Sequence, residues 1–448
     1  MNPIDTWHGL LEPGDVSAAF FEGFSRQMRA ARLTFGDRVH CPFLRPLFVT
    51  AHDEARIRAF AETIAVLGER VVTAALDDPS LLDELGLRDD EKRLVAIDPG
   101  YATASTASRL DAFLLPGSLQ AAEYNAESPA GLGYTEVLAR VFSELPVMER
   151  FRQHYEVQAY SIMAKMLEAL VASYREWGGR EMSPRIAIVD WRGVPTWSEF
   201  EILQERFTAL GAPTLVCTPE DLEFDGRRLS AGGRTIDLVY RRVLMNDILD
   251  KPAESDALVR AYAAKAVCVA NTFRCKIPHK KAFFAILTDD RFSRLVLPGE
   301  RDAIRGGVPW TRVLRDGYAT RDDQRLDLTA YVRANRHQLV VKPNDEYGGA
   351  GVTLGWETTE QAWDDRLHEA LAAPPGTWIV QEKIAVRREV FPFFRGGQDA
   401  ALTDMLVDMA PYLFRGKLAG FLTRLSASGL ANVTSGGGQV PSFLVQAR

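Results

Sequence analysis

Cysteine and histidine are scarce in this chain, whose 448 residues include four cysteines and seven histidines. No two cysteines have C-x-x-C spacing, and none stands near a histidine at the spacing of a zinc site. No H-E-x-x-H or Ser-His-Asp pattern occurs either, so zinc-hydrolase and triad chemistry lack a signature. We therefore expect four free, buried thiols. They are Cys41, Cys217, Cys268 and Cys275.

Long hydrophobic runs and an excess of positive charge are also absent. No apolar stretch reaches the roughly 18 residues that span a bilayer. The N-terminal sequence MNPIDTWHGLLEPGD lacks the basic and apolar regions of a signal peptide. A net charge of −7 gives no electrostatic basis for nucleic-acid binding. We expect a cytoplasmic protein whose partners are small molecules, with neither membrane nor nucleic acid among them.

Lysine is rare as well, with ten lysines and 43 arginines among the 53 basic residues. This bias is typical of a high-GC bacterial genome, and it makes each lysine more informative. The hydrophobic content of 46% and charged content of 25% are those of an ordinary globular protein. Because a single core does not grow to 448 residues, we expect two or three domains.

One of the lysines belongs to a distinctive stretch, Leu339–Trp356, with the sequence LVVKPNDEYGGAGVTLGW. An apolar strand ends in Lys342, a loop containing Gly348, Gly349 and Gly351 follows, and a second apolar strand closes the stretch. Glycines let backbone N–H groups surround an anion, and a lysine adds a mobile positive charge. The order differs from a P-loop, where the lysine follows the glycines. The stretch predicts a polyphosphate site; a hairpin with a glycine-rich turn is the alternative.

A further short strand, Thr377–Ile384, ends in Gln381, Glu382 and Lys383. A strand of this kind can present backbone groups and a carboxylate to an adenine edge and to ribose hydroxyls. The succession of strand-Lys-Pro, glycine loop and Gln-Glu strand resembles the ATP-grasp ligases. Those domains normally close with a Glu-x-Asn metal motif, and none follows Glu382.

The Glu-x-Asn motif stands instead near the start of the chain, in the stretch RLDAFLLPGSLQAAEYNAESP. Arg109 and Asp111 precede a Pro-Gly turn, and Glu123 and Asn125 follow it. A strand has a period of two, so Glu123 and Asn125 share a face, and a hairpin brings Asp111 to them. Two carboxylates and an amide oxygen are suitable ligands for Mg²⁺. Arg109, on the same face as Asp111, is a candidate phosphate contact.

This arrangement resembles the glutathionylspermidine synthetase branch of ATP-grasp proteins, in which the domain is circularly permuted. The resemblance implies an α/β (α+β) fold that uses ATP and one or two Mg²⁺ ions. A Rossmann-like (pre-ATP-grasp) domain would be inserted into the permuted domain, and a helical layer would precede it. The corresponding division is a mainly helical layer at 1–95, the metal-binding part at 96–179, the Rossmann-like substrate domain at 180–265 and the nucleotide-binding part at 266–448.

The resemblance also implies further cationic contacts to the nucleotide. A lysine at the start of the helix that re-enters the domain corresponds to Lys281, with Lys276 as the second choice. The spacing departs from the family, because 61 residues (342 minus 281) separate Lys281 from Lys342, so Arg312 is a third candidate. Arg424 ends a late core strand on a path toward the nucleotide, and we group it with Arg109 as catalytic.

Apolar periodicity predicts several of the remaining elements. The expected helices are Val16–Arg32, Glu54–Gly68 with Asp53 as its cap, Tyr134–Leu145, Tyr155–Trp177 and Thr196–Leu210. The expected strands around the last of these are Ile186–Asp190 and Thr214–Cys217, which together make a βαβ unit. Late in the chain, Asp404–Tyr412 and Leu418–Leu425 read as two core strands.

Substrate contacts are predicted at two places. Arg241 and Arg242 follow Tyr240 at a strand end, where an arginine can clamp a substrate carboxylate bidentately. Structural ion pairing is the alternative for these two. Asn432 opens the run NVTSGGG and is a candidate for the wall of the acceptor pocket.

The resemblance to the ATP-grasp ligases implies an ATP-dependent ligase that joins a carboxylate to an amine through an acyl phosphate and releases ADP and phosphate. The absence of a convincing Ser, Cys or His nucleophile agrees with this chemistry. Two alternatives remain: a kinase-like phosphotransferase on the same fold, and a catalytically silent nucleotide-binding module. The sequence identifies neither the acid nor the amine.

Overall fold

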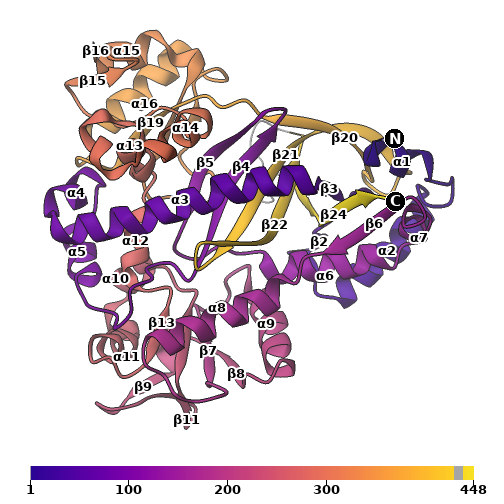
Figure 1. The fold of residues 1–448 in the computed structure, drawn as a ribbon, viewed down its shortest axis with the longest axis horizontal. Helices are drawn as coiled ribbons and strands as arrows, with labels where there is room; N and C mark the ends of the chain where they lie inside the picture. Colours follow the sequence, from indigo (N-terminus) through magenta and orange to yellow (C-terminus); the bar gives the residue numbers. More distant parts are fainter. Residues whose placement is uncertain (1, 428–436) are drawn as a thin grey trace.

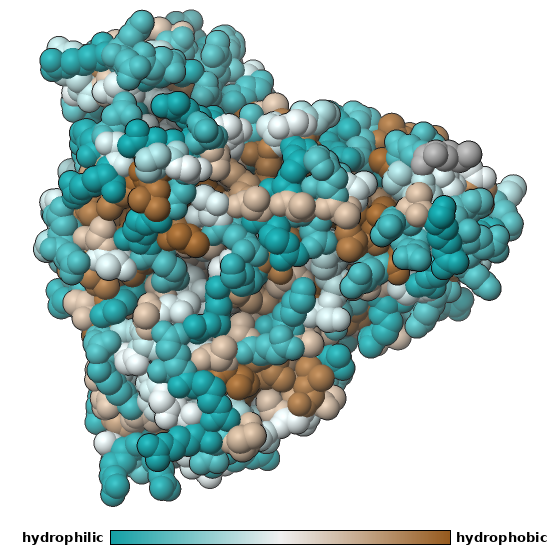
Figure 2. Space-filling model, in the orientation of Figure 1, coloured by the Kyte–Doolittle hydropathy of each residue, from teal (hydrophilic) through white to brown (hydrophobic). Residues whose placement is uncertain are grey.

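The protein is described by a computed structural model that covers residues 2–427 and 437–448. Three parts surround a central antiparallel sheet (Figure 1). A small lobe rises from one corner, a parallel sheet with its helices fills a second, and both chain termini lie at the third. Hydrophilic side chains cover most of the visible surface of these corners (Figure 2).

The helices and strands have the following bounds. The α-helices are α1 (Pro3–Gly9), α2 (Ala18–Ala30), α3 (Ala51–Asp77), α4 (Pro79–Glu84), α5 (Asp89–Val95), α6 (Leu132–Ser143), α7 (Pro146–Phe151), α8 (Ile162–Glu176), α9 (Trp197–Ala209), α10 (Met245–Asp250), α11 (Pro252–Ala263), α12 (Lys276–His279), α13 (Ala282–Thr288), α14 (Pro298–Gly307), α15 (Leu328–Ala334) and α16 (Glu360–Ala372). The strands are β1 (Thr34–Phe35), β2 (Arg38–Val39), β3 (Leu47–Thr50), β4 (Ala107–Leu115), β5 (Ser118–Asn125), β6 (Tyr155–Ala159), β7 (Ile186–Val189), β8 (Thr214–Cys217), β9 (Leu222–Phe224), β10 (Leu229–Ala231), β11 (Arg234–Ile236), β12 (Leu238–Arg241), β13 (Cys268–Ala270), β14 (Thr311–Val313), β15 (Tyr318–Arg321), β16 (Gln324–Asp327), β17 (Leu339–Pro343), β18 (Thr353–Leu354), β19 (Trp378–Glu382), β20 (Arg387–Phe393), β21 (Ala401–Phe414), β22 (Lys417–Ser426), β23 (Gly438–Val440) and β24 (Ser442–Ala447).

The central sheet joins the two ends of the chain. Its strand order is β23-β22-β21-β4-β5, and β20 also pairs with β21. Strand β21 pairs directly with β4, with Tyr412 opposite Arg109. The hairpin β4–β5 and strands about three hundred residues later therefore form one sheet, which is the connectivity of a permuted domain.

The small lobe has an antiparallel sheet of its own, in the order β14-β19-β17-β18. One face packs on α15 and α16 around a separate apolar core. Leu339 and Val341 of β17 point into that core, whereas Val340 and Lys342 line a cavity on the other face. The period of two in a strand explains why one lysine can end an otherwise apolar strand.

The parallel sheet has the order β13-β12-β7-β8, with every neighbouring pair parallel. The predicted unit of strand, helix and strand is present as β7, α9 and β8. The sheet also takes in β13 (Cys268–Ala270), which lies just beyond the predicted end of that domain at 265. The boundaries of the four predicted domains themselves stay predictions.

The predicted helix over Tyr155–Trp177 is wrong in its first part. Residues Tyr155–Ala159 form β6, and the helix α8 begins only at Ile162. Strand β6 pairs antiparallel with β24, at the other end of the sequence. A partner almost three hundred residues away decides the conformation of this segment, so local periodicity misleads here.

The predicted cap of α3 is also wrong, because Thr50 takes that role in place of Asp53. The Thr50 hydroxyl accepts a hydrogen bond from the Asp53 backbone N–H at 3.1 Å and donates to its carboxylate at 2.8 Å. The helix itself is longer than the predicted Glu54–Gly68 and runs over 27 residues. It packs on the central sheet on the face opposite the cavity, where Gly68 contacts the ring of Tyr124.

Two further expectations are tested by the fold. All four cysteines are free and buried, as predicted. Among the described residues, no helix combines the length and the apolar character that crossing a membrane requires.

Candidate active site

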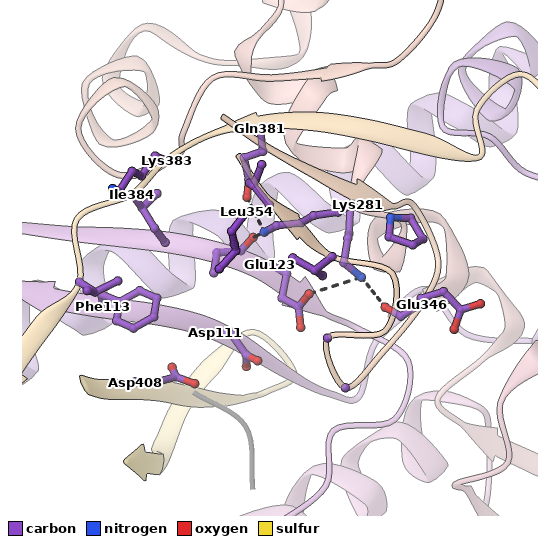
Figure 3. A pocket seen from close by; sticks show the side chains of 18 of the residues that line it. Asp111, Phe113, Glu123, Lys281, Glu346, Leu354, Gln381, Lys383, Ile384 and Asp408 are labelled. Carbon is purple, nitrogen blue, oxygen red and sulfur yellow. Dashed lines mark hydrogen bonds and ion pairs between the residues drawn. The ribbon is translucent and has the colours of Figure 1, made fainter. Parts of the chain in front are cut away.

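A cavity lies between the central sheet and the small lobe. We call it the first cavity; Figure 3 shows its lining. Polar groups from β4, β5, β17 and β21 meet on one side of it, and apolar side chains form the other. The lining residues are Asp111, Phe113, Ala122, Glu123, Lys281, Val340, Lys342, Pro343, Glu346, Gly348, Gly349, Ala350, Val352, Leu354, Trp356, Gln381, Glu382, Lys383, Ile384, Val386, Asp408 and Arg424.

A β-bulge in β5 sets the direction of the predicted metal ligands. Asp111 pairs with Glu123, but the next residue, Ala112, pairs with Ala121, so Ala122 is an extra residue. Before the bulge Leu119 and Ala121 face the core, and after it Tyr124 does. A bulge re-aims the side chains that follow it. It is this extra residue that turns Glu123 and Asn125 away from the core.

Two lysines reach the same wall from other parts of the chain. The ammonium of Lys281 lies 3.3 Å from the Glu123 carboxylate and donates to the backbone oxygen of Glu346 at 2.5 Å. Lys342 donates to the Gln381 side-chain oxygen at 2.6 Å and to the Ala122 carbonyl at 3.4 Å. Glu123 and the lysine that precedes the glycine loop thus line one cavity, although 219 positions (342 minus 123) separate them.

The protonation states of Glu123 and Lys342 depend on burial as well as on neighbouring charges. Burial alone would raise the pKa of the Glu123 carboxyl, but Lys281, Lys342 and the hydrogen bond from Asn125 together keep that pKa below its ordinary value. Burial lowers the pKa of Lys342 to about 8, with Glu123 acting in the opposite direction. An anion that enters the cavity would therefore stabilise the charged form of Lys342.

Next to them lies a cluster of two arginines and two aspartates. Arg109 holds Asp111 with both nitrogens of its fork, at 2.7 and 3.2 Å. Arg424 donates to Asp111 at 2.6 Å and to Asp408 at 2.7 Å. The two arginines keep the pKa of Asp111 well below its ordinary value despite burial. Burial raises the pKa of Asp408 to about 6, Arg424 opposes this, and the neighbouring Asp111 adds to it.

These residues fit a magnesium ion held jointly with phosphates. Mg²⁺ in nucleotide sites uses one or two carboxylates, and the nucleotide and water supply the other oxygens. Asp111 and Glu123 offer two carboxylates, and Asp408 has a buried oxygen without a hydrogen-bond partner. Asn125 donates to Glu123 at 3.1 Å and so leaves its own amide oxygen available. Within residues 2–427 and 437–448, no three His, Cys, Asp or Glu side chains form a metal cluster unaided.

The glycine loop borders the same cavity as Glu123. Gly348, Gly349 and Gly351 have φ angles of 66°, 79° and 71°, a region that other residues rarely adopt. A Cβ on Gly351 would lie 2.6 Å from the ring of Pro343. The three glycines are therefore required by the backbone path, which leaves the loop exposed beside the cavity.

Gln381, Glu382 and Lys383, at the end of β19, each make a different contact. Gln381 orients Lys342, and its amide nitrogen donates to Thr311 at 3.1 Å. The Glu382 carboxylate accepts from Arg321 at 2.6 Å at the cavity rim, where it is one-third exposed. Lys383 places its ammonium 4.3 Å from the ring centre of Trp356.

A second cavity adjoins the first, and Glu123, Gly348 and Arg424 line both. Arg109, Asn125 and Arg242 belong to the second cavity only. Its full lining is His40, Arg109, Glu123, Asn125, Ser128, Pro129, Ala130, Gly131, Tyr134, Asp190, Val194, Pro195, Thr196, Arg242, Leu244, Asp247, His279, Tyr347, Gly348, Leu422, Arg424 and Gln439.

Several predicted contacts lie outside both cavities. Arg241 has no exposed side-chain surface and donates to Glu127 at 3.0 Å and to the Val243 carbonyl at 2.7 Å. Lys276 is buried against Glu127 and Asp345, at 3.2 and 2.7 Å. For these two the geometry favours the structural alternative.

The remaining predicted contacts are Arg312 and Asn432. Arg312 is buried, donates to the carbonyls of Thr311 and Thr320, and does not line either cavity. Asn432 lies outside the described residues.

Sequence reasoning missed two features of the first cavity. Asp408 lies in the middle of a predicted strand and was not singled out as a site residue. The apolar side, which includes Phe113 and Leu354 (Figure 3), is equally invisible to motif reading. The aspartate in an otherwise apolar strand, DMLVDMAPYLF, was the available signal for Asp408.

Comparison with known proteins agrees with this geometry. The model of the family described as circularly permuted ATP-grasp type 2 matches residues 115–434, so Arg109 and Asp111 precede the matched range. A putative glutamate–cysteine ligase 2-3 of Frankia alni is 27% identical over 339 residues, covering 72% of this chain and 36% of that protein. A putative glutamate–cysteine ligase 2-2 of Frankia casuarinae is 25% identical over 338 residues, with the same coverage.

A solved structure resembles nearly the whole chain. The glutathione synthetase-like effector of Globodera pallida superposes with a TM-score of 0.58, covering 94% of this chain and 95% of the other at 13% identity. At that identity the likeness concerns the fold alone. The chain spans little more than a third of the length of the two curated relatives that it matches.

Proposed function

The chain belongs to the circularly permuted ATP-grasp type 2 family, and from this premise we propose that it is an ATP-dependent ligase that joins a carboxylate to an amine. One observation carries the proposal. Side chains from β4–β5, from the start of α13 and from β17 converge on the first cavity, and that cavity opens beside a second one. A ligase needs this pairing, because the nucleotide and the acceptor must meet at the transferred phosphoryl group.

In this proposal ATP occupies the first cavity. Lys342 and Lys281 neutralise its phosphates, and the glycine loop covers them with backbone N–H groups. The strand end at Gln381–Lys383 and the apolar side contact the nucleoside. A Mg²⁺ ion held by Asp111, Glu123 and Asn125 would neutralise the charge that develops on the phosphates during transfer. Asp408 is a further candidate for this ion.

The second cavity then holds the acid that receives the γ-phosphoryl group. Phosphoryl transfer gives an acyl phosphate, and attack by an amine forms the amide and releases phosphate. Arg424 lies at the junction of the cavities and Arg109 lines the second cavity, and both can stabilise the negative charge of the transferred group. Because an acyl phosphate hydrolyses readily, the glycine loop also has to exclude water.

The names of the relatives support a ligase over the two alternatives. The Frankia proteins are called putative glutamate–cysteine ligases, and such a reaction joins a carboxylate to an amine. A kinase-like phosphotransferase would make a stable phosphoryl product without an amine. A silent module would make no product at all.

Isotope transfer tests the proposal directly. The protein is incubated with ATP, Mg²⁺ and ¹⁸O-labelled carboxylic acids, with and without a mixture of amines. We expect amine-dependent ADP release and ¹⁸O in the released phosphate, because one carboxylate oxygen leaves with the phosphoryl group. A phosphorylated product that is stable without an amine would support the kinase. Absence of nucleotide binding would overturn both catalytic interpretations.

Glu123 is the first residue to change. Glu123→Gln keeps the size and removes the charge that faces Lys281, so we expect turnover to fall by at least about a hundredfold. Its thermal unfolding midpoint should stay close to that of the parent protein. Glu360→Gln, on the exposed first turn of α16, is the matched control and should retain full turnover. Equal turnover in the two variants would remove Glu123 from the site.

A further inference from the structure

The second cavity has an acidic wall built by the parallel sheet. Asp190 follows β7 directly, at the carboxyl end of that strand, and Asp247 lies in the first turn of α10. Both line the second cavity, and neither lines the first. Open parallel sheets bind their ligands at the carboxyl ends of their strands. The wall is therefore where a substrate of this domain is expected.

In the described part of the chain neither carboxylate forms a direct ion pair, although Arg242 acts on Asp190 and Lys251 on Asp247 from farther away. Among the described residues, no Lys, Arg or His nitrogen lies within 4.0 Å of Asp190 or Asp247 in an ion pair. Asp190 is 8% exposed, and one of its oxygens accepts a hydrogen bond from the Trp191 backbone N–H at 2.8 Å. Burying a carboxylate without a counter-charge is costly. Almost every other buried carboxylate around the two cavities is held by an arginine or a lysine.

The charge of Asp247 also acts on Asp190. Burial raises the pKa of Asp190 to about 6; Arg242 opposes this, and the charge of Asp247 adds to it. Burial likewise raises the pKa of Asp247. A positively charged group between Asp190 and Asp247 would supply a counter-charge and reduce the repulsion between the two carboxylates.

A histidine in the same cavity supplies an independent observation. His40 is 3% exposed, and its Nε2 lies 3.0 Å from the Thr34 carbonyl oxygen, so that nitrogen carries the hydrogen. Its Nδ1 is consequently an acceptor beside the Gln439 side chain, and the Gln439 Oε1 in the same cavity is buried without a hydrogen-bond partner among the described residues. The second cavity thus offers acceptors in need of donors on more than one of its walls.

The charged group that this wall would hold is not the reacting amine. An amine must lose its proton before it can attack an acyl phosphate, whereas two carboxylates stabilise the protonated form. The reaction takes place at the junction lined by Glu123, Gly348 and Arg424, which Asp190 and Asp247 do not border. The substrate therefore has two functional groups, one reacting and one charged.

Resting on the proposed function, we propose that Asp190 and Asp247 bind a positively charged amino or guanidino group that a substrate carries apart from its reacting group. The substrate class is then amino acids and diamines or their guanidino counterparts. Simple monocarboxylic acids and monoamines are excluded from tight binding.

Binding of matched pairs of small molecules tests this inference. The positively charged probes are L-lysine and L-norleucine against hexanoate, and 1,4-diaminobutane and agmatine against 1-butanol, since neither counterpart carries an ammonium or guanidinium group. Each is titrated calorimetrically in the presence of Mg²⁺ and a non-hydrolysable ATP analogue. In the parent protein, at least one charged probe should bind roughly tenfold or more tightly than its counterpart. That preference should vanish in Asp190→Asn and in Asp247→Asn, with the affinity for the ATP analogue unchanged. Asp250→Asn, at the exposed end of α10, should keep it.

The outcomes distinguish a failure of this inference from a failure of the proposed function. If the ATP analogue binds but no charged probe is preferred, or if the preference survives both variants, the inference is overturned and the ligase proposal stands. If the ATP analogue itself does not bind, the proposed function fails first. Loss of analogue binding together with probe binding in the aspartate variants would give these residues a structural role and would also overturn the inference.

Discussion

At the scale of single residues, the most informative side chain is Lys342. It ends an apolar strand, and burial lowers its pKa to about 8. Its hydrogen bonds go to neutral oxygens of Gln381 and Ala122. Neutral acceptors orient the ammonium without fully balancing its charge, so a phosphate that enters the cavity should be strongly preferred.

This predicts a pH dependence of nucleotide binding. Phosphates favour the charged form of Lys342, so its pKa is higher in the complex than the value of about 8 without nucleotide. Affinity for the ATP analogue should then be constant from about pH 7 to 7.5 and fall above pH 8, by up to tenfold per pH unit. Calorimetry at pH 8.5, in buffers that differ in ionisation enthalpy, should detect uptake of a proton on binding.

Lys342→Met provides the control for that titration. The variant should bind the analogue at least about tenfold more weakly at pH 7, because one charge-assisted contact is lost, and its affinity should not change between pH 7.5 and 9. Lys417→Met removes an exposed lysine that pairs with Glu62 and should behave as the parent protein. A pH slope that persists in Lys342→Met would assign the titration to another group.

Individual residues were predictable where the motif is local. The spacing of Asp111, Glu123 and Asn125, and the order of Lys342 and the glycines, are visible within short stretches. Arg241 shows the limit of this reasoning. A strand-end arginine pair looks the same in sequence whether it faces a substrate or a buried carboxylate, and Glu127, its partner, lies more than a hundred positions earlier.

At the scale of elements, the glycine loop and the bulge in β5 are the two local backbone features that shape the site. The hairpin was predicted, but the bulge was not. Strict alternation from Leu119 would have pointed Glu123 into the core, and the extra residue reverses that direction. Strand β6 was missed for a related reason: its partner β24 is remote. Periodicity predicts an element only when nearby residues decide its conformation.

Gly351→Ala tests the requirement of the loop for glycine. The new methyl group would meet the Pro343 ring at 2.6 Å, in a backbone region that alanine disfavours. We expect the loop to change its path, and turnover to fall at least about tenfold, with little change in the thermal midpoint because the loop is exposed. Gly397→Ala, also at positive φ but with open space around its Cβ position, is the matched control for backbone strain. Equal activity in both variants would contradict a role for the loop's exact course.

At the scale of the whole molecule, one buried ion network ties the parts together. Glu127 follows the hairpin β4–β5 and pairs with Arg241 of the parallel sheet and with Lys276 of α12. Lys276 in turn pairs with Asp345, at the base of the glycine loop. Burial would raise the pKa of Glu127, but Lys276 and Arg241 lower it to about 2. The network therefore remains charged throughout the physiological range.

Breaking this network should cost stability rather than substrate affinity. Arg241→Met leaves Glu127 with less counter-charge in a fully buried position, and we expect a loss of about 3–5 kcal/mol in the free energy of unfolding, measured with urea. The affinity for the ATP analogue should stay within about twofold. Arg185→Met removes a half-exposed pair with Asp237 and should cost at most about 1 kcal/mol.

The opposite pattern would restore the substrate role first predicted for Arg241. An unchanged urea midpoint, combined with weaker binding of a carboxylate probe such as L-lysine, would show that its guanidinium reaches the ligand. At this scale the sequence predicted the permuted fold from two motif blocks in reversed order. It could not predict which cations hold the blocks together, since that depends on contacts between all parts.

The pairing of β4 with β21 has a consequence for how the chain acquires its structure during synthesis. Asn125 and Ala401 are 276 residues apart (401 minus 125), so at roughly 5–20 residues per second the hairpin β4–β5 waits about 14–55 s for its neighbour. During that interval the free edge of β4 is open to wrong partners. Helix α3 emerges earlier than the hairpin and packs on its apolar face through Gly68 and Tyr124. We expect α3 to cover this face of the hairpin until β21 and β22, which extend the sheet beyond β4, have been synthesised.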